Sequence, residues 1–247
     1  NYAMFMSAQP KVKIFSDFDG TITLYDTWIE MGERFIKNKE KWAEVIKNFE
    51  EQKIGARECF LAECALIEDF DKEEFDRIID SQRLDPMFLQ FVDFCSVRNL
   101  PLMILSEGMD YYIARILGNN GLDIPFYANK LVFSEDSHSI GLEFPNADSD
   151  CMKCGTSKRN ILMNNTADDE ISVFIGDGFS DACAVNYADI VFAKKSLASY
   201  CWKNNITYHE YQTFGDIKKK LERILESKKL KHRDAAKIKR REVFLRG

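Results

Sequence analysis

The sequence lacks a long apolar run, and none of its hydrophobic segments approaches the roughly 20 residues that cross a bilayer. We therefore expect no membrane partner. The N-terminal stretch "NYAMFMSAQPKVK" has no basic region followed by an apolar region, so it predicts no secretory signal. With 45% hydrophobic and 30% charged residues, the 247-residue chain is typical of a soluble protein with a substantial core.

The cysteines of the sequence do not suggest a disulfide framework, and its three histidines are too scattered to complete a zinc site. The seven cysteines are an odd number and lie mostly in apolar patterns, which favours free thiols in a reducing cytoplasm. Cys151 and Cys154 form a C-x-x-C pair, but the only histidines, His138, His209 and His232, occur in unrelated contexts. We interpret the pair as structural thiols, with part of a metal site as the alternative.

The net charge of −6 is unevenly distributed. Residues 227–247 carry nine Lys/Arg against two Asp/Glu, a local charge of +7 that leaves −13 on the rest of the chain. A basic tail can bind nucleic acid. The single aromatic residue of this segment, Phe244, does not make a pattern of aromatics interleaved with charges, however, so we predict a solvated terminal helix and no nucleic-acid partner.

Short runs rich in Val, Ile and Phe recur along the chain and alternate with helical patterns. Each run is apolar at consecutive positions, which is typical of strands covered on both faces of a parallel sheet. The alternation predicts an α/β protein with a doubly wound parallel sheet. The expected strands are 11–18, 100–106, 171–177, 188–193 and 206–211.

Two segments interrupt this alternation. Residues 24–99 contain amphipathic helical patterns and no convincing strand, so they predict an inserted helical domain. Residues 129–145 contain two alternating runs around a polar turn, which predicts a β-hairpin. The expected organisation is a core of residues 1–23 and 100–226, a helical cap of 24–99, and a basic tail of 227–247.

Polar side chains follow three of the expected strands where each strand ends. Asp17 and Asp19 follow the first strand, Ser106 ends the second, and Asp177 and Asp181 follow the third. The carboxyl ends of parallel strands meet at one edge of the sheet, so four carboxylates should converge there. Clustered carboxylates repel one another unless a cation is present. Oxygen ligands at a strand-end loop favour Mg²⁺.

The stretches "DFDGTIT", "ILSEG" and "GDGFSD", with a lysine between the last two, resemble the four motifs of the haloacid dehalogenase superfamily in their order. The resemblance runs from Ile14 to about Ala193 and implies a Rossmann-like core with an all-helical cap. It also implies that Asp17 is a nucleophile that forms an aspartyl-phosphate, that Asp19 is the general acid and base, and that Ser106 binds the phosphoryl oxygens.

The same resemblance implies a Mg²⁺ site. Its ligands are the carboxylates of Asp17 and Asp177 and the backbone carbonyl of Asp19, while Asp181 binds through water or holds a ligand in place. From the residues alone, Asp181 is equally able to cap the helix that follows it. The motif lysine is Lys158 or Lys153, and we favour Lys158 because it begins a helix after a glycine.

Among superfamily members, "CGTSK" and "GARECF" are most similar to the phosphoserine-phosphatase-like enzymes, closest to the methionine-salvage group that acts on 2-hydroxy-3-keto-5-methylthiopentenyl-1-phosphate. This similarity makes Arg57 and Glu58 candidates for substrate binding, together with Glu107 and Gly108 beside Ser106. Glu107 departs from the S-G-G pattern of phosphoserine phosphatases, and its acid is expected to repel carboxylated substrates.

We therefore predict a Mg²⁺-dependent phosphomonoesterase acting on a small cytoplasmic metabolite. Two alternatives stay open at this point. One is a phosphotransferase or mutase that uses the same aspartates. The other is a non-enzymatic regulatory module whose basic tail binds nucleic acid.

Overall fold

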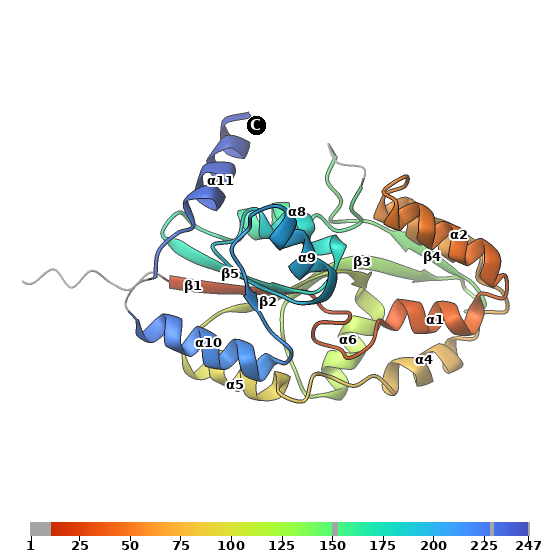
Figure 1. The fold of residues 1–247 in the computed structure, drawn as a ribbon. Coiled ribbons are helices and arrows are strands. Elements are labelled where there is room, and N and C mark those ends of the chain that lie inside the picture. The colour runs from red at the N-terminus through yellow and green to blue at the C-terminus, as the bar shows by residue number, and fades with distance from the viewer. Residues whose placement is uncertain (1–10, 150–152, 228–229, 247) are drawn as a thin grey trace, which may run out of the picture.

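The computed structural model describes residues 11–149, 153–227 and 230–246. Its central element is a sheet whose strands lie in the order β4-β3-β2-β1-β5-β6-β7 (Figure 1). All neighbouring strands pair in parallel except β3 and β4, which are antiparallel. The strands are β1 (Lys11–Ser16), β2 (Leu102–Met109), β3 (Phe126–Phe133), β4 (Ile140–Glu143), β5 (Glu170–Gly176), β6 (Ile190–Ala193) and β7 (His209–Glu210).

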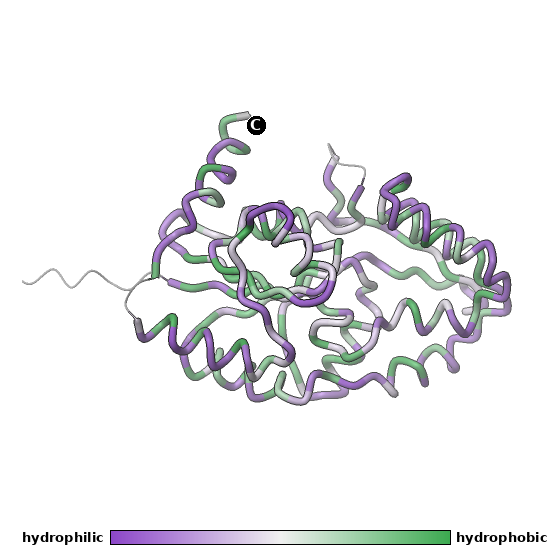
Figure 2. The backbone as a smooth tube through the Cα atoms, in the orientation of Figure 1, coloured by the Kyte–Doolittle hydropathy of each residue, from purple (hydrophilic) through white to green (hydrophobic). Residues whose placement is uncertain are grey.

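Helices cover both faces of this sheet, because its central strands are apolar at consecutive positions. Ile14, Ile104 and Val173 belong to one buried cluster, which includes side chains of α5 (Phe88–Val97), α6 (Asp110–Asn119) and α10 (Phe214–Glu226). Phe15 and Phe174 point the other way and pack with α7 (Lys158–Asn164), α8 (Ala182–Val185) and α9 (Lys195–Lys203). The predicted doubly wound α/β fold is confirmed, and Figure 2 shows apolar residues in the strands of the sheet and in the helices around it.

The predicted hairpin is confirmed, but its first strand has a second role. β3 pairs with β4 through Lys130–Phe133 and with β2 through Phe126, Tyr127 and Asn129. Residues 126–127 precede the segment from which the hairpin was predicted, so the sequence pattern missed this extension of the main sheet. The predicted strand at 206–211 is reduced to the two residues of β7 at the sheet edge.

Residues 24–99 contain helices, as expected, and the described residues there form no strand longer than an isolated bridge. The helices of the insert are α1 (Thr27–Phe35), α2 (Lys39–Glu50), α3 (Ala56–Ala65) and α4 (Lys72–Asp80). α5, although it falls in the same range, packs with α10: the rings of Phe88 and Phe91 lie 4.8 and 5.0 Å from that of Phe214. This helix is thus a layer of the core.

The two connections between insert and core run side by side. Thr23 and Leu84 form an antiparallel bridge, the Leu24 N–H donates to the Arg83 carbonyl at 2.9 Å, and the Asp85 N–H donates to Ile22 at 2.8 Å. The first connection leads directly from the loop after β1. The insert is therefore attached to the core next to Asp17 and Asp19.

The basic C-terminal segment forms α11 (Asp234–Arg246). We predicted that this helix is solvated, but part of it is buried. Arg240 is buried, its guanidinium lies 3.1 Å from the Asp189 carboxylate, and it also donates to the Tyr187 carbonyl. The Arg233 N–H donates to the same carboxylate at 3.1 Å. These contacts fix the start of α11 to the loop before β6. None of the helices in the described residues is both long and apolar enough to cross a membrane.

Candidate active site

Asp17 lies at the end of β1, where the strand gives way to a tight loop. Its N–H donates to the Ile175 carbonyl at 2.9 Å, which ties the end of β1 to the neighbouring end of β5. The loop then closes on the Phe18 carbonyl, which accepts from the N–H groups of Thr21, Ile22 and Thr23. Gly20 has a φ of +71°, and a Cβ there would lie 2.7 Å from Asp177 Oδ2. The glycine is required for both its conformation and its closeness to Asp177.

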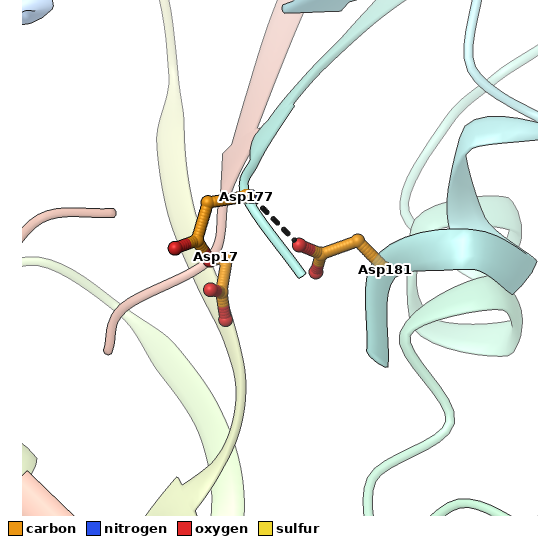
Figure 3. A group of neighbouring side chains, drawn as sticks. All are labelled: Asp17, Asp177 and Asp181. Carbon is orange, nitrogen blue, oxygen red and sulfur yellow. Dashed lines mark hydrogen bonds between the residues drawn. The ribbon is translucent and has the colours of Figure 1, made fainter. Parts of the chain in front are cut away.

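Carboxylate oxygens of Asp17, Asp177 and Asp181 lie within 4.8 Å of one another. Figure 3 shows these side chains, which come from the end of β1, the end of β5 and the turn after β5. This donor set fits Mg²⁺, which prefers oxygen ligands from one or two carboxylates and keeps several waters. The Asp19 side chain is not part of this cluster. Its predicted contribution through the backbone carbonyl stays a prediction.

Asp181 is held by hydrogen bonds to its own turn. Its Oδ2 accepts from the N–H groups of Asp177 and Gly178 at 3.0 and 3.1 Å, and its Oδ1 lies 2.6 Å from Lys158 Nζ. Both oxygens are therefore committed to contacts that fix the turn carrying Asp177. This arrangement favours the holding role for Asp181 over direct metal binding.

Lys158 is buried at the start of α7 and joins two of these acids. Its Nζ lies 2.6 Å from Asp17 Oδ1 and 2.6 Å from Asp181 Oδ1, and its side chain is 1% exposed. Lys153 is exposed, and among the described residues no ion pair joins it to these acids. Of the two predicted lysines, the structure brings only Lys158 to Asp17.

Burial and neighbouring charges shift the pKa values of Asp17 and Lys158. Burial raises the pKa of Asp17 to about 7, with Asp181 adding to the rise and Lys158 opposing it. For Lys158, burial lowers the pKa, but the charges of Asp17 and Asp181 outweigh it and the pKa is raised overall. The lysine thus stays charged and compensates the Asp17 carboxylate.

Asp19 points away from the cluster and is fixed by two donors. Its Oδ1 accepts from the Thr27 N–H at 3.0 Å, and its Oδ2 accepts from the buried Tyr112 hydroxyl at 2.7 Å. Burial, followed by the charge of Asp26, raises the pKa of Asp19 well above its ordinary value. A raised pKa suits a carboxyl that acts as a general acid. Tyr112 belongs to a helical pattern, and no local signal marked it as a site residue.

The segment Ser106–Gly108 at the end of β2 borders the same space. The buried Ser106 Oγ accepts from the Gly108 N–H at 2.8 Å, which fixes the hydroxyl. A Cβ on Gly108 would lie 2.0 Å from the Tyr112 hydroxyl and 2.5 Å from Asp19 Oδ2. Gly108 therefore makes room for the contact that positions Asp19.

Glu107 is buried and connects this segment to the loop before Lys158. Its Oε2 accepts from the N–H groups of Gly155 and Thr156 at 2.9 and 3.1 Å, whereas its Oε1 is buried without a hydrogen-bond partner among the described residues. Burial raises its pKa to about 7, and the charge of Lys158 and the two N–H donors oppose the rise.

A cavity of about 550 Å³ joins these residues to the insert. Asp17, Asp19, Ser106, Glu107, Gly108 and Asp177 line its core side. Its insert side is largely apolar and aromatic, with Leu24, Tyr25, Trp28, Ile29, Ile46, Phe49 and Phe60. Arg57 and Glu58 do not line it, although Ala56 and Cys59 of the same helix do. Tyr25, Asp26 and Trp28, which follow the nucleophile loop in sequence, face the cavity.

Lys195 also lines the cavity, and its sequence position gave no reason to expect it there. The interpretation of Cys151 and Cys154 as structural thiols stays a prediction, because one of the two is not described. Cys151 lies outside the described residues, and Cys154 is hydrogen-bonded to Cys183.

Comparison with known proteins agrees with this geometry. Residues 14–185 match the family of haloacid dehalogenase-like hydrolases. A 2-hydroxy-3-keto-5-methylthiopentenyl-1-phosphate phosphatase from Bacillus pumilus is 31% identical over 86% of this chain and 91% of its own length. Its namesake from Bacillus cereus is 29% identical over 88% and 99%. A substrate-bound phosphoserine phosphatase structure superposes with a TM-score of 0.66 at 19% identity, covering 86% of this chain and 98% of its own.

Proposed function

The chain belongs to the haloacid dehalogenase-like hydrolases, and from this premise we propose that it is a Mg²⁺-dependent phosphomonoesterase acting on a small phosphorylated metabolite through an aspartyl-phosphate. One observation carries the proposal. Lys158 compensates the Asp17 carboxylate at 2.6 Å, while Asp19, two residues away, has a pKa raised well above its ordinary value. The Lys158-paired carboxyl of Asp17 and a second carboxyl with a raised pKa thus face one cavity.

In the first step, an oxygen of Asp17 attacks the phosphorus of the ester, and the bond from phosphorus to the ester oxygen breaks. Asp19 donates its proton to the departing oxygen, so the alcohol leaves neutral. Both oxygens of Asp19 are fixed by Tyr112 and Thr27, which keeps the carboxyl oriented for this transfer.

In the second step, ionised Asp19 takes a proton from water, and the oxygen of that water attacks the phosphorus of the aspartyl-phosphate. The bond between phosphorus and Asp17 breaks, which releases inorganic phosphate and restores the Asp17 carboxylate. Ser106 offers its fixed hydroxyl to the phosphoryl oxygens in both steps. Lys158 is buried behind Asp17 and acts on the nucleophile rather than on the organic part of the substrate.

Asp17 and Asp177 would hold Mg²⁺, with the Asp19 carbonyl as the further ligand that the family resemblance implies. The ion supplies positive charge next to the phosphoryl oxygens as negative charge develops on them. Asp181 keeps the turn of Asp177 in place through the two N–H donors described above.

The charges in the cavity support a substrate whose organic part has no second negative group. Seven of the described lining residues are Asp or Glu, and the one Lys or Arg among them is Lys195. These acids would repel a substrate carboxylate beside the phosphate, and few positively charged groups are there to bind it. The charges of the cavity therefore disfavour phosphoserine as a substrate. The substrate named for the Bacillus relatives carries no such carboxylate. We assign the recognition of the organic part to Tyr25, Ile29, Phe49 and Phe60 rather than to Arg57 and Glu58.

Phosphate release from a panel of esters tests the proposal. The panel pairs each ester that has an uncharged organic part with a carboxylated analogue, with Mg²⁺ present and Asp17→Asn as the blank. We expect turnover that depends on Asp17 and favours the uncharged member of each pair. Phosphate appearing on an added alcohol rather than in solution would identify a phosphotransferase instead. Absence of turnover for every ester, including p-nitrophenyl phosphate, contradicts the proposal.

We also infer a reducing cytoplasmic setting for this enzyme. None of the six described cysteines is in a disulfide, and four of them are at least partly covered within helices. A protein of an oxidising compartment more often pairs its cysteines.

A further inference from the structure

Lys195 contacts a predicted metal ligand. Its Nζ lies 2.7 Å from Asp177 Oδ2 and 3.4 Å from the Gly20 carbonyl oxygen. The ammonium thus lies between the C-terminal end of β5 and the loop that carries Asp19. Asp177 is the acid in the cluster whose carboxylate Lys158 does not contact, so Lys195 provides its positive partner.

The backbone around Lys195 is tied to the same strand end. The Lys194 N–H donates to the Gly176 carbonyl at 3.3 Å, the Leu197 N–H donates to the Asp177 carbonyl at 3.0 Å, and the Ser196 hydroxyl donates to that carbonyl at 3.3 Å. These bonds hold the first turn of α9 against the residues that precede and include Asp177. The lysine stem therefore starts close to the carboxylate in any rotamer.

Lys195 also has an unfavourable backbone conformation. Its φ is +49°, in the left-handed region where a side chain with a Cβ costs about 1 kcal/mol or more. Glycine would adopt this conformation without that cost. A lysine kept in a strained position, beside a metal ligand and on the wall of the cavity, points to a role for its charge.

An ammonium and a divalent cation repel each other, and both bind the lone pairs of carboxylate oxygens. The Lys195 side chain is 59% exposed and that of Asp177 only 12%, so the lysine can turn away without rearrangement of the core, whereas the carboxylate cannot follow it. We propose that Lys195 competes with Mg²⁺ for Asp177, so that the metal binds only as the ammonium leaves. The proposal rests on the proposed function in that Mg²⁺ is the metal.

This competition lowers the affinity for Mg²⁺ and stabilises the protein when the metal concentration is low. Asp17, Asp177 and Asp181 lie within 4.8 Å, and Lys158 contacts only two of them. Lys195 supplies the remaining positive charge. Because the pair is partly exposed, its strength is that of a surface ion pair, and its effect on the dissociation constant is about fivefold.

Isothermal titration calorimetry of the intact protein with Mg²⁺ alone tests this. We expect Lys195→Met to bind Mg²⁺ about fivefold more tightly than the wild type, and Lys195→Arg, which keeps the charge, to bind like the wild type. Lys194→Met is the matched control, because it removes the same charge one residue away, where the ammonium lies over the Tyr211 ring. Lys195→Gln gives a second uncharged variant should Lys195→Met fold poorly.

Each outcome decides the question. Unchanged or weaker Mg²⁺ binding by both uncharged variants overturns the proposal, as does an equal gain in Lys194→Met, which indicates a general field rather than competition. A wild type that binds no Mg²⁺ at millimolar concentrations removes both this inference and the metal of the proposed function. If the wild type binds Mg²⁺ and releases phosphate while Lys195→Met matches its affinity, only the inference fails.

Discussion

The hydroxyl of Tyr112 donates a hydrogen bond to Asp19 Oδ2 across 2.7 Å, which links α6 to the loop after β1. Tyr112 is completely buried, so its hydroxyl stays in place. With the Thr27 N–H on Oδ1, both oxygens of Asp19 have a fixed donor. The proposed acid thus depends on a tyrosine 93 residues further along the chain.

Tyr112→Phe should lower kcat about tenfold and move the alkaline limb of kcat/KM to higher pH. The hydrogen bond from Tyr112 stabilises ionised Asp19 and lowers its pKa, so its loss raises that pKa further. The acid then holds its proton to higher pH, but the later step, which needs the ionised form, slows. Tyr111→Phe is the matched control, because the Tyr111 hydroxyl contacts Asp76 of the insert instead. A variant with unchanged pH dependence would argue against this role.

Asp17→Asn should abolish turnover, by at least about 1,000-fold, and leave the fold intact. The amide keeps the shape of the carboxyl but cannot attack phosphorus. Asp93→Asn removes an exposed acid of α5 in the same way and should retain activity. Phosphate release and circular dichroism check both variants. Turnover of Asp17→Asn within tenfold of the wild type would exclude Asp17 as the nucleophile.

Chelation of metal should remove activity, Mg²⁺ should restore it, and Ca²⁺ should inhibit. The clustered oxygens of Asp17 and Asp177 suit a hard cation, and Mg²⁺ requires near-octahedral geometry that the larger Ca²⁺ distorts. Phosphate release after exhaustive chelation, with each ion added back alone, measures the effect. Full activity in the chelated protein would contradict a metal-dependent reaction.

Lys158→Ala should cost far more activity than Lys153→Ala, and about 3 kcal/mol or more of stability. Removal of the buried ammonium leaves Asp17 and Asp181 without their shared cation, whereas Lys153 is exposed. Chemical denaturation measures the free energy of unfolding. Lys158→Arg keeps a charge in place and separates loss of fold from loss of catalysis. The opposite ranking of the two alanine variants would place the third motif at Lys153.

Glu107 should make the stability of the protein depend on pH. Its pKa is raised from 4.5 to about 7 in the folded protein, so the folded state binds this proton more tightly than the unfolded state. The resulting stability is present below the unfolded pKa and is lost as pH rises through about 7. From pH 5 to 8, the wild type should lose on the order of 2 kcal/mol relative to Glu107→Gln.

Denaturation of both proteins at the two pH values measures this difference. Glu44→Gln removes an exposed acid from α2 and should show no such change. A constant difference between wild type and Glu107→Gln across this range would mean that Glu107 titrates as an ordinary carboxyl.

The sequence predicts the parts of the site that are set locally. Asp17, Ser106 and Asp177 each follow an apolar run, and parallel pairing of those runs is sufficient to bring their ends together. Lys158 was predicted because a glycine and a helix start mark its place. The alternation of strands and helices likewise determines the two covered faces of the sheet.

The remaining features depend on contacts that no local pattern encodes. Tyr112 and Lys195 reach the site through helix packing and through hydrogen bonds to the end of β5, and nothing in "MDYY" or "AKKS" signals this. The basic tail looked solvated because its charges were counted without the Asp189 carboxylate that pairs with Arg240. The family resemblance made Arg57 a candidate for substrate binding, but the residues of α3 that line the cavity include its neighbours Ala56 and Cys59 and not Arg57 itself.

The paired connections at Thr23 and Leu84 have a consequence for how such a protein is assembled in evolution. Because Leu24 donates to Arg83 at 2.9 Å, the chain leaves the core and returns to it at nearly the same point. A tight turn of two or three residues is long enough to join Thr23 to Leu84. The strands of the described sheet and α5 all lie outside the segment that such a turn would replace. The helices α1–α4 therefore form an exchangeable module, and a different insertion at this junction can change the substrate while the aspartates stay where they are.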